Sequence, residues 1–278
     1  TFTNRAAEYF KHTSFAGMGN DIADINNDGL VDVVELDMRP EDNARQKLII
    51  PPTGYDKFQL SLRMGYEPQF SRNTFQLNQG SNKFSEISFL SGISSTDWSW
   101  SALAADYDND GDKDLFVTNG FLRDLGNMDY ITYQNIYNTP LGTVQAKADR
   151  KLTSIKSLEG AVLRNYIFEN KNDLTFANQS EAWGMDTKGI SQGAAYADLD
   201  NDGDLDLVVN NMNEEAFVYE NKSNEIFRRN YLRIKFKGSL QNRDGIGVKV
   251  TIYNQKQMQF FEHFMNRGFE STVDDVLH

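Results

Sequence analysis

An acidic nonapeptide with the frame D-x-[DN]-N-D-G-x-x-D occurs three times in the chain and constrains the fold more than any other feature. The copies are "DINNDGLVD" at 24–32, "DYDNDGDKD" at 106–114 and "DLDNDGDLD" at 198–206. Small or apolar residues precede each copy ("GNDIA", "SALAA", "GAAYA"), and apolar, β-prone residues follow it. The repeated unit is therefore predicted to be a strand, an acidic loop and a second strand.

Each nonapeptide carries the ligand types of a hard cation. Oxygen-bearing side chains at positions 1, 3, 5 and 9, a carbonyl at position 7 and a glycine at position 6 match the oxygen-rich, flexible shell of Ca²⁺. Mg²⁺ demands tighter octahedral geometry, and softer metals prefer His or Cys, which the nonapeptides lack. About three Ca²⁺ sites are predicted, with these ligands: Asp24, Asn26, Asp28, Leu30 and Asp32; Asp106, Asp108, Asp110, Asp112 and Asp114; Asp198, Asp200, Asp202, Asp204 and Asp206.

Two other interpretations of the nonapeptides are weaker. Asp, Asn and Gly also form ordinary polar turns, but three copies with one carboxylate spacing favour a cation. The first copy resembles an EF-hand because Glu35 stands at position 12, where the other copies have Val117 and Val209. An EF-hand needs flanking helices, whereas these flanks are β-prone. We also expect the first site to bind more weakly, because Asn26 replaces a carboxylate.

The composition restricts the class of protein. The chain has 278 residues, a formal charge of -12 and 12% aromatic residues, and thirteen of its 40 acidic residues lie in the nonapeptides. Without a basic stripe, binding to nucleic acid is not expected. The absence of Cys excludes disulfides, thiolate metal sites and a Cys nucleophile. No apolar run approaches the ~18 residues of a membrane span. The first and last residues, "TFTNRAAEYF" and "VDDVLH", suggest a piece of a longer protein.

The stretches between the nonapeptides predict further hairpins and two insertions. "NTFQLNQGSNKFSEIS" and "NYIFENKNDLTFANQS" each read as strand, turn, strand, and "EAFVYENKSNEIF" begins the pattern again. The insertion near 40–66 contains two short helical candidates separated by Pro51-Pro52. The insertion near 121–163 is mostly helical, with apolar residues near a 3.6 period from Leu141 to Leu158. Packing on the sheet edges is the favoured interpretation of this second insertion, and a surface that shapes a binding site is the alternative.

The last fifty residues have a different sequence pattern from the repeats. "YLRIKFKG" and "VKVTIYN" alternate, and "NRDGIG" between them is typical of a turn. We predict a segment of repeats at 1–227 and a separate, truncated small β module at 228–278.

These motifs resemble known families. The acidic hairpins with the preceding "NTFQLN" and "NYIFEN" strands resemble FG-GAP/VCBS repeats, the β-propeller blades of integrin α-subunit heads and many bacterial surface proteins. "NYLRIKFKGSLQNRDGIGVKVTIY" resembles the start of the ASPIC/UnbV domain. The combination is similar to the cartilage-acidic-protein type, and the insertions are similar to those of Bacteroidetes-like surface proteins.

The resemblance implies a mainly β fold of propeller blades with calcium-binding hairpin loops, helical insertions and a small C-terminal β module. It also implies an extracellular or cell-surface location, in bacteria the outer envelope. A closed propeller has four to eight blades. Three calcium hairpins therefore imply either calcium-free blades or a ring completed outside this chain.

Signals for catalysis are few. "GISQG" at 189–193 matches a nucleophile elbow, but it leads into a β-hairpin and not into the helix that this motif requires, so Ser191 is not predicted to be catalytic. Trp98, Trp100 and Trp183 are expected to pack within blades. The predicted function is a non-enzymatic, calcium-binding surface protein for adhesion or recognition of a protein or glycan partner. The alternatives are an enzyme or accessory module in polysaccharide binding or uptake, and a structural subunit of an outer-membrane complex.

Overall fold

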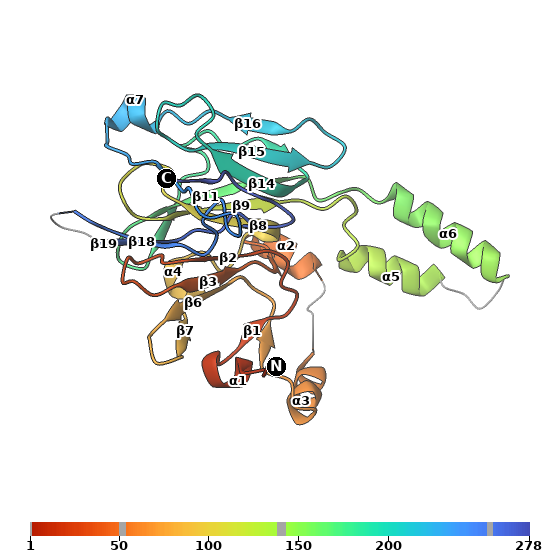
Figure 1. Ribbon diagram of the computed structural model, residues 1–278. Helices are drawn as coiled ribbons and strands as arrows, with labels where there is room; N and C mark the ends of the chain where they lie inside the picture. The colour runs from red at the N-terminus through yellow and green to blue at the C-terminus, as the bar shows by residue number, and fades with distance from the viewer. Residues whose placement is uncertain (1, 50–53, 138–142, 255–257) are drawn as a thin grey trace.

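The computed structural model describes residues 2–49, 54–137, 143–254 and 258–278, and its main body is three antiparallel sheets (Figure 1). The first sheet has the order β2-β3-β6-β7, the second has β12-β11-β9-β8-β4, and the third has β14-β15-β16. The strands of the first sheet are β2 (Asn20–Ala23), β3 (Asp32–Glu35), β6 (Thr74–Asn78) and β7 (Phe84–Glu86). The second has β4 (Met38–Arg39), β8 (Asp97–Ala105), β9 (Asp114–Asn119), β11 (Tyr166–Asn170) and β12 (Phe176–Asn178), and the third has β14 (Ser191–Ala197), β15 (Asp206–Asn211) and β16 (Phe217–Tyr219).

The three sheets repeat one plan. In each, an acidic nonapeptide joins the first two strands and a third strand pairs with the second. The first and second sheets add a fourth strand, β7 or β12, whereas helix α7 (Ser223–Phe227) stands at this place in the sequence after β16. The predicted strand–loop–strand unit and the predicted hairpins before the second and third copies are therefore confirmed.

The core lies between the layers of sheet. Every residue of β9 is buried, because the second sheet is covered on both faces. One apolar cluster, which includes Val34, Phe75 and Leu115, fills the space between the first and second sheets. Another, which includes Phe116 and Leu207, fills the space between the second and third. The acidic hairpins lie at the ends of these layers.

The first insertion forms the two helices that the sequence predicts, α2 (Asn43–Leu48) and α3 (Tyr55–Arg63). Pro51 and Pro52 lie outside the described residues. Asp42 caps α2 by accepting a 2.8 Å hydrogen bond from the Arg45 amide. The Arg45 guanidinium donates to Asp97 on β8 and to Asp124, which ties α2 to the second sheet.

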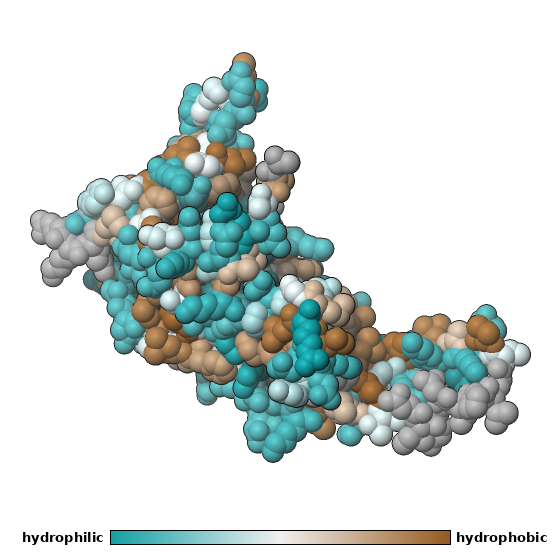
Figure 2. Space-filling model, turned by 90° about the horizontal axis from the view of Figure 1, so that it is seen from below, coloured by the Kyte–Doolittle hydropathy of each residue, from teal (hydrophilic) through white to brown (hydrophobic). Residues whose placement is uncertain are grey.

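The second insertion forms a helical arm, α5 (Met128–Tyr137) and α6 (Val144–Ser157). Leu141 lies outside the described residues. The arm extends away from the sheets (Figure 1) and forms a separate lobe in the space-filling view (Figure 2). No residue of α6 is buried. The favoured interpretation, packing on the sheet edges, is therefore wrong. The apolar residues of α6 are too few to pack the helix against the sheets.

The C-terminal residues form one hairpin and one pair of sequence-distant strands, and the segment from the hairpin to the last strand crosses the inner strands of the sheets. Strand β18 (Lys249–Tyr253) pairs with β19 (Met258–Glu262), and β17 (Ile234–Lys235) pairs with β20 (Val276–Leu277). Further on, Gly268 bridges Asn20 on β2, and the Phe269 amide donates a 3.2 Å hydrogen bond to Ser101 Oγ on β8. The predicted small β module is thus packed against the repeats.

The remaining elements are short. The described chain also contains α1 (Ala6–Tyr9), the parallel pair β1 (Thr13–Ser14) and β5 (Gln69–Phe70), α4 (Ser88–Ser91), and the antiparallel pair β10 (Leu163–Arg164) and β13 (Lys188–Gly189). Of the helices that the structure describes, none has both the length and the apolar character needed to cross a bilayer.

Candidate metal centre

The three acidic nonapeptides form β-hairpin loops of one geometry. The strand before each loop ends on an alanine, and the ninth aspartate is the first residue of the next strand. The cross-strand partners are Ala23 with Asp32, Ala105 with Asp114, and Ala197 with Asp206. The flanking strands exclude the EF-hand interpretation of the first copy and confirm the predicted hairpin turns.

Positions 4 and 6 of each loop have left-handed backbone. Gly29, Gly111 and Gly203 have φ values of 85°, 97° and 92°. The asparagines at position 4, which are Asn27, Asn109 and Asn201, have φ values of 58°, 59° and 64°. Asparagine tolerates this region better than most residues. Sequence reasoning assigned no role to position 4, although all three copies share the tripeptide "NDG" at positions 4–6, which was the available signal for a left-handed turn.

The position-4 asparagines also connect successive loops. Asn27 Nδ2 donates a 3.0 Å hydrogen bond to the Gly111 carbonyl, and Asn109 Nδ2 donates one of 3.0 Å to the Gly203 carbonyl. Each bond joins one loop to the glycine of the next. The three loops therefore lie side by side at one end of the sheets.

The ninth aspartate connects each loop to the third strand of its sheet. Its two carboxylate oxygens accept one backbone N–H from position 2 of the loop and one from an asparagine at or just beyond the end of the third strand. The donors are Ile25 and Asn78 for Asp32, Tyr107 and Asn170 for Asp114, and Leu199 and Asn221 for Asp206. The asparagines end "QLN", "FEN" and "YEN", a repeated signal whose role sequence reasoning missed.

The first aspartate is held differently in the third loop. Asp24 and Asp106 each accept the N–H groups of positions 5 and 6 at 2.8–3.1 Å, which fixes the carboxylates in place. Both carboxylate oxygens of Asp198 are buried and accept no hydrogen bond from any described residue. A guanidinium nitrogen of Arg233 lies 2.9 Å from Asp198 Oδ2. Buried carboxylate oxygens without donors are atoms that a cation would satisfy.

Ligand oxygens converge in the second and third loops. Those of Asp106, Asp108 and Asp114 lie within 4.8 Å of one another, and so do those of Asp198, Asp200 and Asp202. The first loop has no such carboxylate cluster among the described residues, as the substitution by Asn26 leads one to expect. The buried Oδ1 of Asn26 has no hydrogen-bond donor there. All of these donors are oxygens, so the residues present fit Ca²⁺.

At position 7 the side chains of the second and third loops serve other purposes. Asp112 Oδ1 accepts a 2.8 Å hydrogen bond from Asn27, and Asp204 Oδ2 accepts from Ser223 Oγ and the Asn224 amide. Since these carboxylates face neighbouring groups, the backbone carbonyl is the atom that Asp112, Asp204 and Leu30 can offer to a cation. Their predicted role as carbonyl ligands stays a prediction.

The loops bring many carboxylates together in positions that are partly buried from solvent. Burial raises the pKa of Asp32 and of Asp106 to about 7, and it raises the pKa of Asp114 well above its usual range. Two arginines reduce the repulsion: a guanidinium nitrogen of Arg229 lies 2.8 Å from Asp108, and Arg233 faces Asp198 as described. The cost of ionising these groups is what a bound divalent cation would remove.

Ser191 is not arranged as a nucleophile. Its side chain is fully buried at the start of β14, where Oγ donates to Asn211 Oδ1 at 2.7 Å and accepts from Asn165 Nδ2 at 3.0 Å. Trp183 packs against the core between the second and third sheets, as expected. Trp98 and Trp100 instead stack on Phe121, which lies in the second insertion.

Family comparisons agree with this repeat architecture. A model of the FG-GAP-like repeat matches residues 65–117 and 159–209, which contain the second and third acidic nonapeptides. A model of the domain described as ASPIC and UnbV matches residues 238–278. The chain carries FG-GAP-like repeats and an ASPIC and UnbV domain. The resemblance inferred from the motifs is thereby confirmed, and so is the mainly β fold.

The hairpin at 24–32 lies outside the matched ranges, although its geometry equals that of the other two. No curated protein sequence matches the chain. FG-GAP repeats usually occur in extracellular or surface proteins, and they suggest a recognition module.

Proposed function

We propose that this chain is a calcium-binding, non-enzymatic recognition module of an extracellular or cell-surface protein. Ca²⁺ binds the three acidic hairpins, holds the ends of the sheets together and rigidifies the surface that contacts a protein or glycan partner. The sheets act as propeller blades. A bacterial outer envelope is the proposed location.

One observation carries the calcium proposal. Asp198 has two buried carboxylate oxygens that accept no hydrogen bond, inside a cluster with Asp200 and Asp202. Arg233, 2.9 Å from Asp198 Oδ2, offsets part of the charge of these three carboxylates. A cation with oxygen ligands would neutralise the rest and would satisfy the buried oxygens. The second hairpin has a carboxylate cluster of its own, and the first shares the same cross-strand register, which extends the proposal to about three sites.

The expected stabilisation is substantial. Extracellular calcium modules bind with Kd values of about 10⁻⁴–10⁻³ M. At a Ca²⁺ concentration about twenty times Kd, each occupied site stabilises the fold by about 2 kcal/mol. Chelation with EDTA should therefore lower Tm by several degrees.

The direct test measures Ca²⁺ binding and Tm together. Isothermal titration calorimetry should detect Ca²⁺ uptake, and Asp198→Asn should remove one site and part of the Tm response to EDTA. Asp202→Ala should act in the same way. Asp173→Asn is the matched control, because Asp173 lies exposed in the ordinary turn between β11 and β12 and should leave both readouts unchanged. Identical melting curves with and without EDTA would contradict the proposal.

The absence of catalysis is tested separately. Ser191 is buried, and the carboxylates of the hairpins are held by backbone N–H groups or arginines, which supports a binding role. A glycan array combined with a hydrolase screen decides: binding without turnover supports recognition. Turnover abolished by one carboxylate substitution outside the hairpins would support an enzyme or a polysaccharide-uptake module. Stable co-purification of membrane partners would instead support a structural subunit of an outer-membrane complex.

A further inference from the structure

A cavity of about 680 Å³ lies where the second acidic hairpin meets the C-terminal residues. We call it the junction cavity. Asp106 and Asp110 of the hairpin form one wall, the segment 228–232 forms another, and the β18–β19 hairpin closes the third side with Gln259 and Phe261. Its volume suits a small ligand of two or three sugar rings.

A cation in the segment 228–232 faces this cavity without a partner. Arg228 is exposed, lines the cavity, and forms no ion pair with any residue that the structure describes. Its neighbour Arg229 is already engaged by Asp108 at 2.8 Å. Arg228 ends α7 with a left-handed φ of 51°, and its amide donates to the Asn224 carbonyl, which fixes the backbone from which the side chain projects.

An aromatic ring beside Arg228 is fixed in position. Tyr231 lines the cavity and stacks on His278 with a centroid distance of 5.7 Å and an interplanar angle of 11°. It also lies so close to Gly203 of the third hairpin that a Cβ there would come within 1.9 Å of the ring. Tyr231 nevertheless remains 47% exposed. A rigid, half-exposed ring loses little entropy when a ligand stacks on it.

Polar amides complete the lining. Asn230, Asn254 and Gln259 border the cavity, and Gln259 Nε2 is anchored by a 3.1 Å hydrogen bond to the Gly111 carbonyl. Amides next to an aromatic face bind hydroxyl-rich rings, whereas an arginine binds a carboxylate through charge-assisted hydrogen bonds. The lining contains Lys113, the paired Arg229 and the exposed Arg228, together with one aromatic platform and several amides. This combination points to a sugar that carries a carboxylate.

The acidic wall makes this binding depend on the metal. Without Ca²⁺, Asp106 and Asp110 repel an anion across the cavity, and Lys113 on the same lining offsets only part of their charge. Ca²⁺ on the second hairpin reduces the negative charge of that wall. This step rests on the proposed function, since it requires that the hairpin binds Ca²⁺.

We propose that the junction cavity binds a uronic-acid-containing oligosaccharide, with its carboxylate on Arg228 and a sugar ring on Tyr231, in the presence of Ca²⁺. An acidic peptide would use the same arginine but would gain less from the flat ring and the amides. The acidic glycan is therefore the ligand class that the lining favours.

Calorimetry on the full chain tests the proposal. A hyaluronan tetrasaccharide and trigalacturonate are titrated at saturating Ca²⁺ and with EDTA, and chitotetraose serves as the neutral counterpart. Arg228→Asn removes the charge while tolerating the positive φ, and Arg243→Asn is the control at another exposed arginine. At least one acidic probe should bind, and it should bind more tightly at saturating Ca²⁺ than in EDTA. Arg228→Asn and Tyr231→Ala should each weaken it by about tenfold or more, the loss of one charge-assisted hydrogen bond or one stacked ring.

Ca²⁺ titration of the same samples separates the two levels of inference. If Ca²⁺ binds and neither acidic probe does, the junction-cavity proposal is overturned and the proposed function stands. If no Ca²⁺ binds, the proposed function fails first. Equal affinity for chitotetraose, an Arg228→Asn protein that binds like the wild type, or an Asp-rich peptide that binds in place of both sugars would each also overturn the acidic-sugar assignment.

Discussion

At the scale of single residues, the fourth-position asparagines combine two roles. Their backbone takes the left-handed conformation that the loop requires, and the side-chain amides of Asn27 and Asn109 donate to the next loop, which a carboxylate could not do. Asn109 is nearly buried and also donates to Asn224 Oδ1 at 3.1 Å. The adjacent hairpins are therefore fixed to one another by neutral donors, which add no charge to a crowded acidic end.

The substitution Asn109→Ala tests this connection. It removes both hydrogen bonds and leaves the buried Gly203 carbonyl without this donor, so the free energy of unfolding should fall by about 1–3 kcal/mol. Asn201→Ala is the matched control, because Asn201 has the same backbone conformation but is exposed. Urea unfolding at saturating Ca²⁺ measures both variants. Equal losses would show that backbone conformation alone, and not the link between loops, accounts for the effect.

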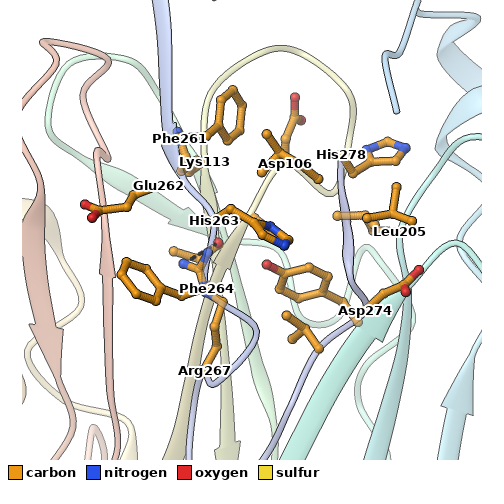
Figure 3. Close-up of a pocket in the computed structure, with 16 residues that line it drawn as sticks. Asp106, Lys113, Leu205, Phe261, Glu262, His263, Phe264, Arg267, Asp274 and His278 are labelled. Atoms are coloured by element: carbon orange, nitrogen blue, oxygen red, sulfur yellow. Dashed lines mark hydrogen bonds between the residues drawn. The ribbon is translucent and has the colours of Figure 1, made fainter. Parts of the chain in front are cut away.

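At the scale of elements, the C-terminal segment is fastened across the inner strands by a buried ion pair. Arg267 Nη2 donates to Asp21 Oδ2 on β2 at 2.7 Å and to the Ala104 carbonyl on β8 at 3.3 Å. The Ala104 amide donates to the same Asp21 oxygen at 2.7 Å. Figure 3 shows Phe261, His263 and Arg267 along this segment, with Asp106 and Leu205 of the repeats beside it. One side chain thus joins two sheets and the ASPIC and UnbV domain.

Removing the Arg267 guanidinium should lower the free energy of unfolding strongly. Arg267→Met leaves Asp21 buried without its counter-charge, and the expected loss is about 3–5 kcal/mol of unfolding free energy. The double variant Asp21→Asn/Arg267→Met should recover part of that loss, because no uncompensated charge remains. Lys235→Met, which breaks the exposed pair with Asp275, is the control and should cost less than about 1 kcal/mol. Chemical denaturation of the four proteins would contradict the assignment if Arg267→Met matched the control.

The elements also show what the sequence could predict. The hairpins at 24–32, 106–114 and 198–206 and the helices on either side of 50–53 follow from local chemistry, namely turn residues, β-prone flanks and proline. The direction of the α5–α6 arm and the crossing of 263–278 over the sheets depend on contacts between distant residues, such as Arg267 with Asp21. No local pattern encodes such contacts. The ninth aspartates could be predicted as ligands, but their bonds to Asn78, Asn170 and Asn221 required the sheet to be known.

At the scale of the whole molecule, charge is distributed unevenly. The formal charge is -12, and the three aligned hairpins gather thirteen acidic residues at one end of the sheets. Arg229, Arg233 and Lys113 oppose only part of this charge. Burial lowers the pKa of Lys113 to about 8, so keeping this side chain protonated also costs free energy. Stability should therefore depend on pH and Ca²⁺ together.

The sign of that dependence follows from the hairpin carboxylates. Without Ca²⁺, Asp32 and Asp106 have pKa values of about 7 when folded, against an ordinary value of 3.8. Between these values the folded chain holds more protons than the unfolded chain, so this stabilising contribution is present below about pH 4 and is lost as the pH rises through 7. The pKa of Glu86 is shifted in the opposite direction. Hydrogen bonds from Ser88 and Arg72 outweigh its burial and hold this pKa below the usual range.

Melting curves at about pH 5 and about pH 8 check this sign. In EDTA, Tm should be lower at the higher pH than at the lower pH, because the buried carboxylates must ionise. With saturating Ca²⁺ the fall should shrink or disappear, since the cation binds the ionised form and displaces the protons. The Tm gained from Ca²⁺ should therefore be larger at the higher pH. The double variant Asp32→Asn/Asp106→Asn, which cannot ionise at these positions, should show a flatter profile in EDTA. A Tm that rises between the two pH values in EDTA, or a Ca²⁺ effect that is larger at the lower pH, would mean that the hairpin carboxylates are already ionised without metal.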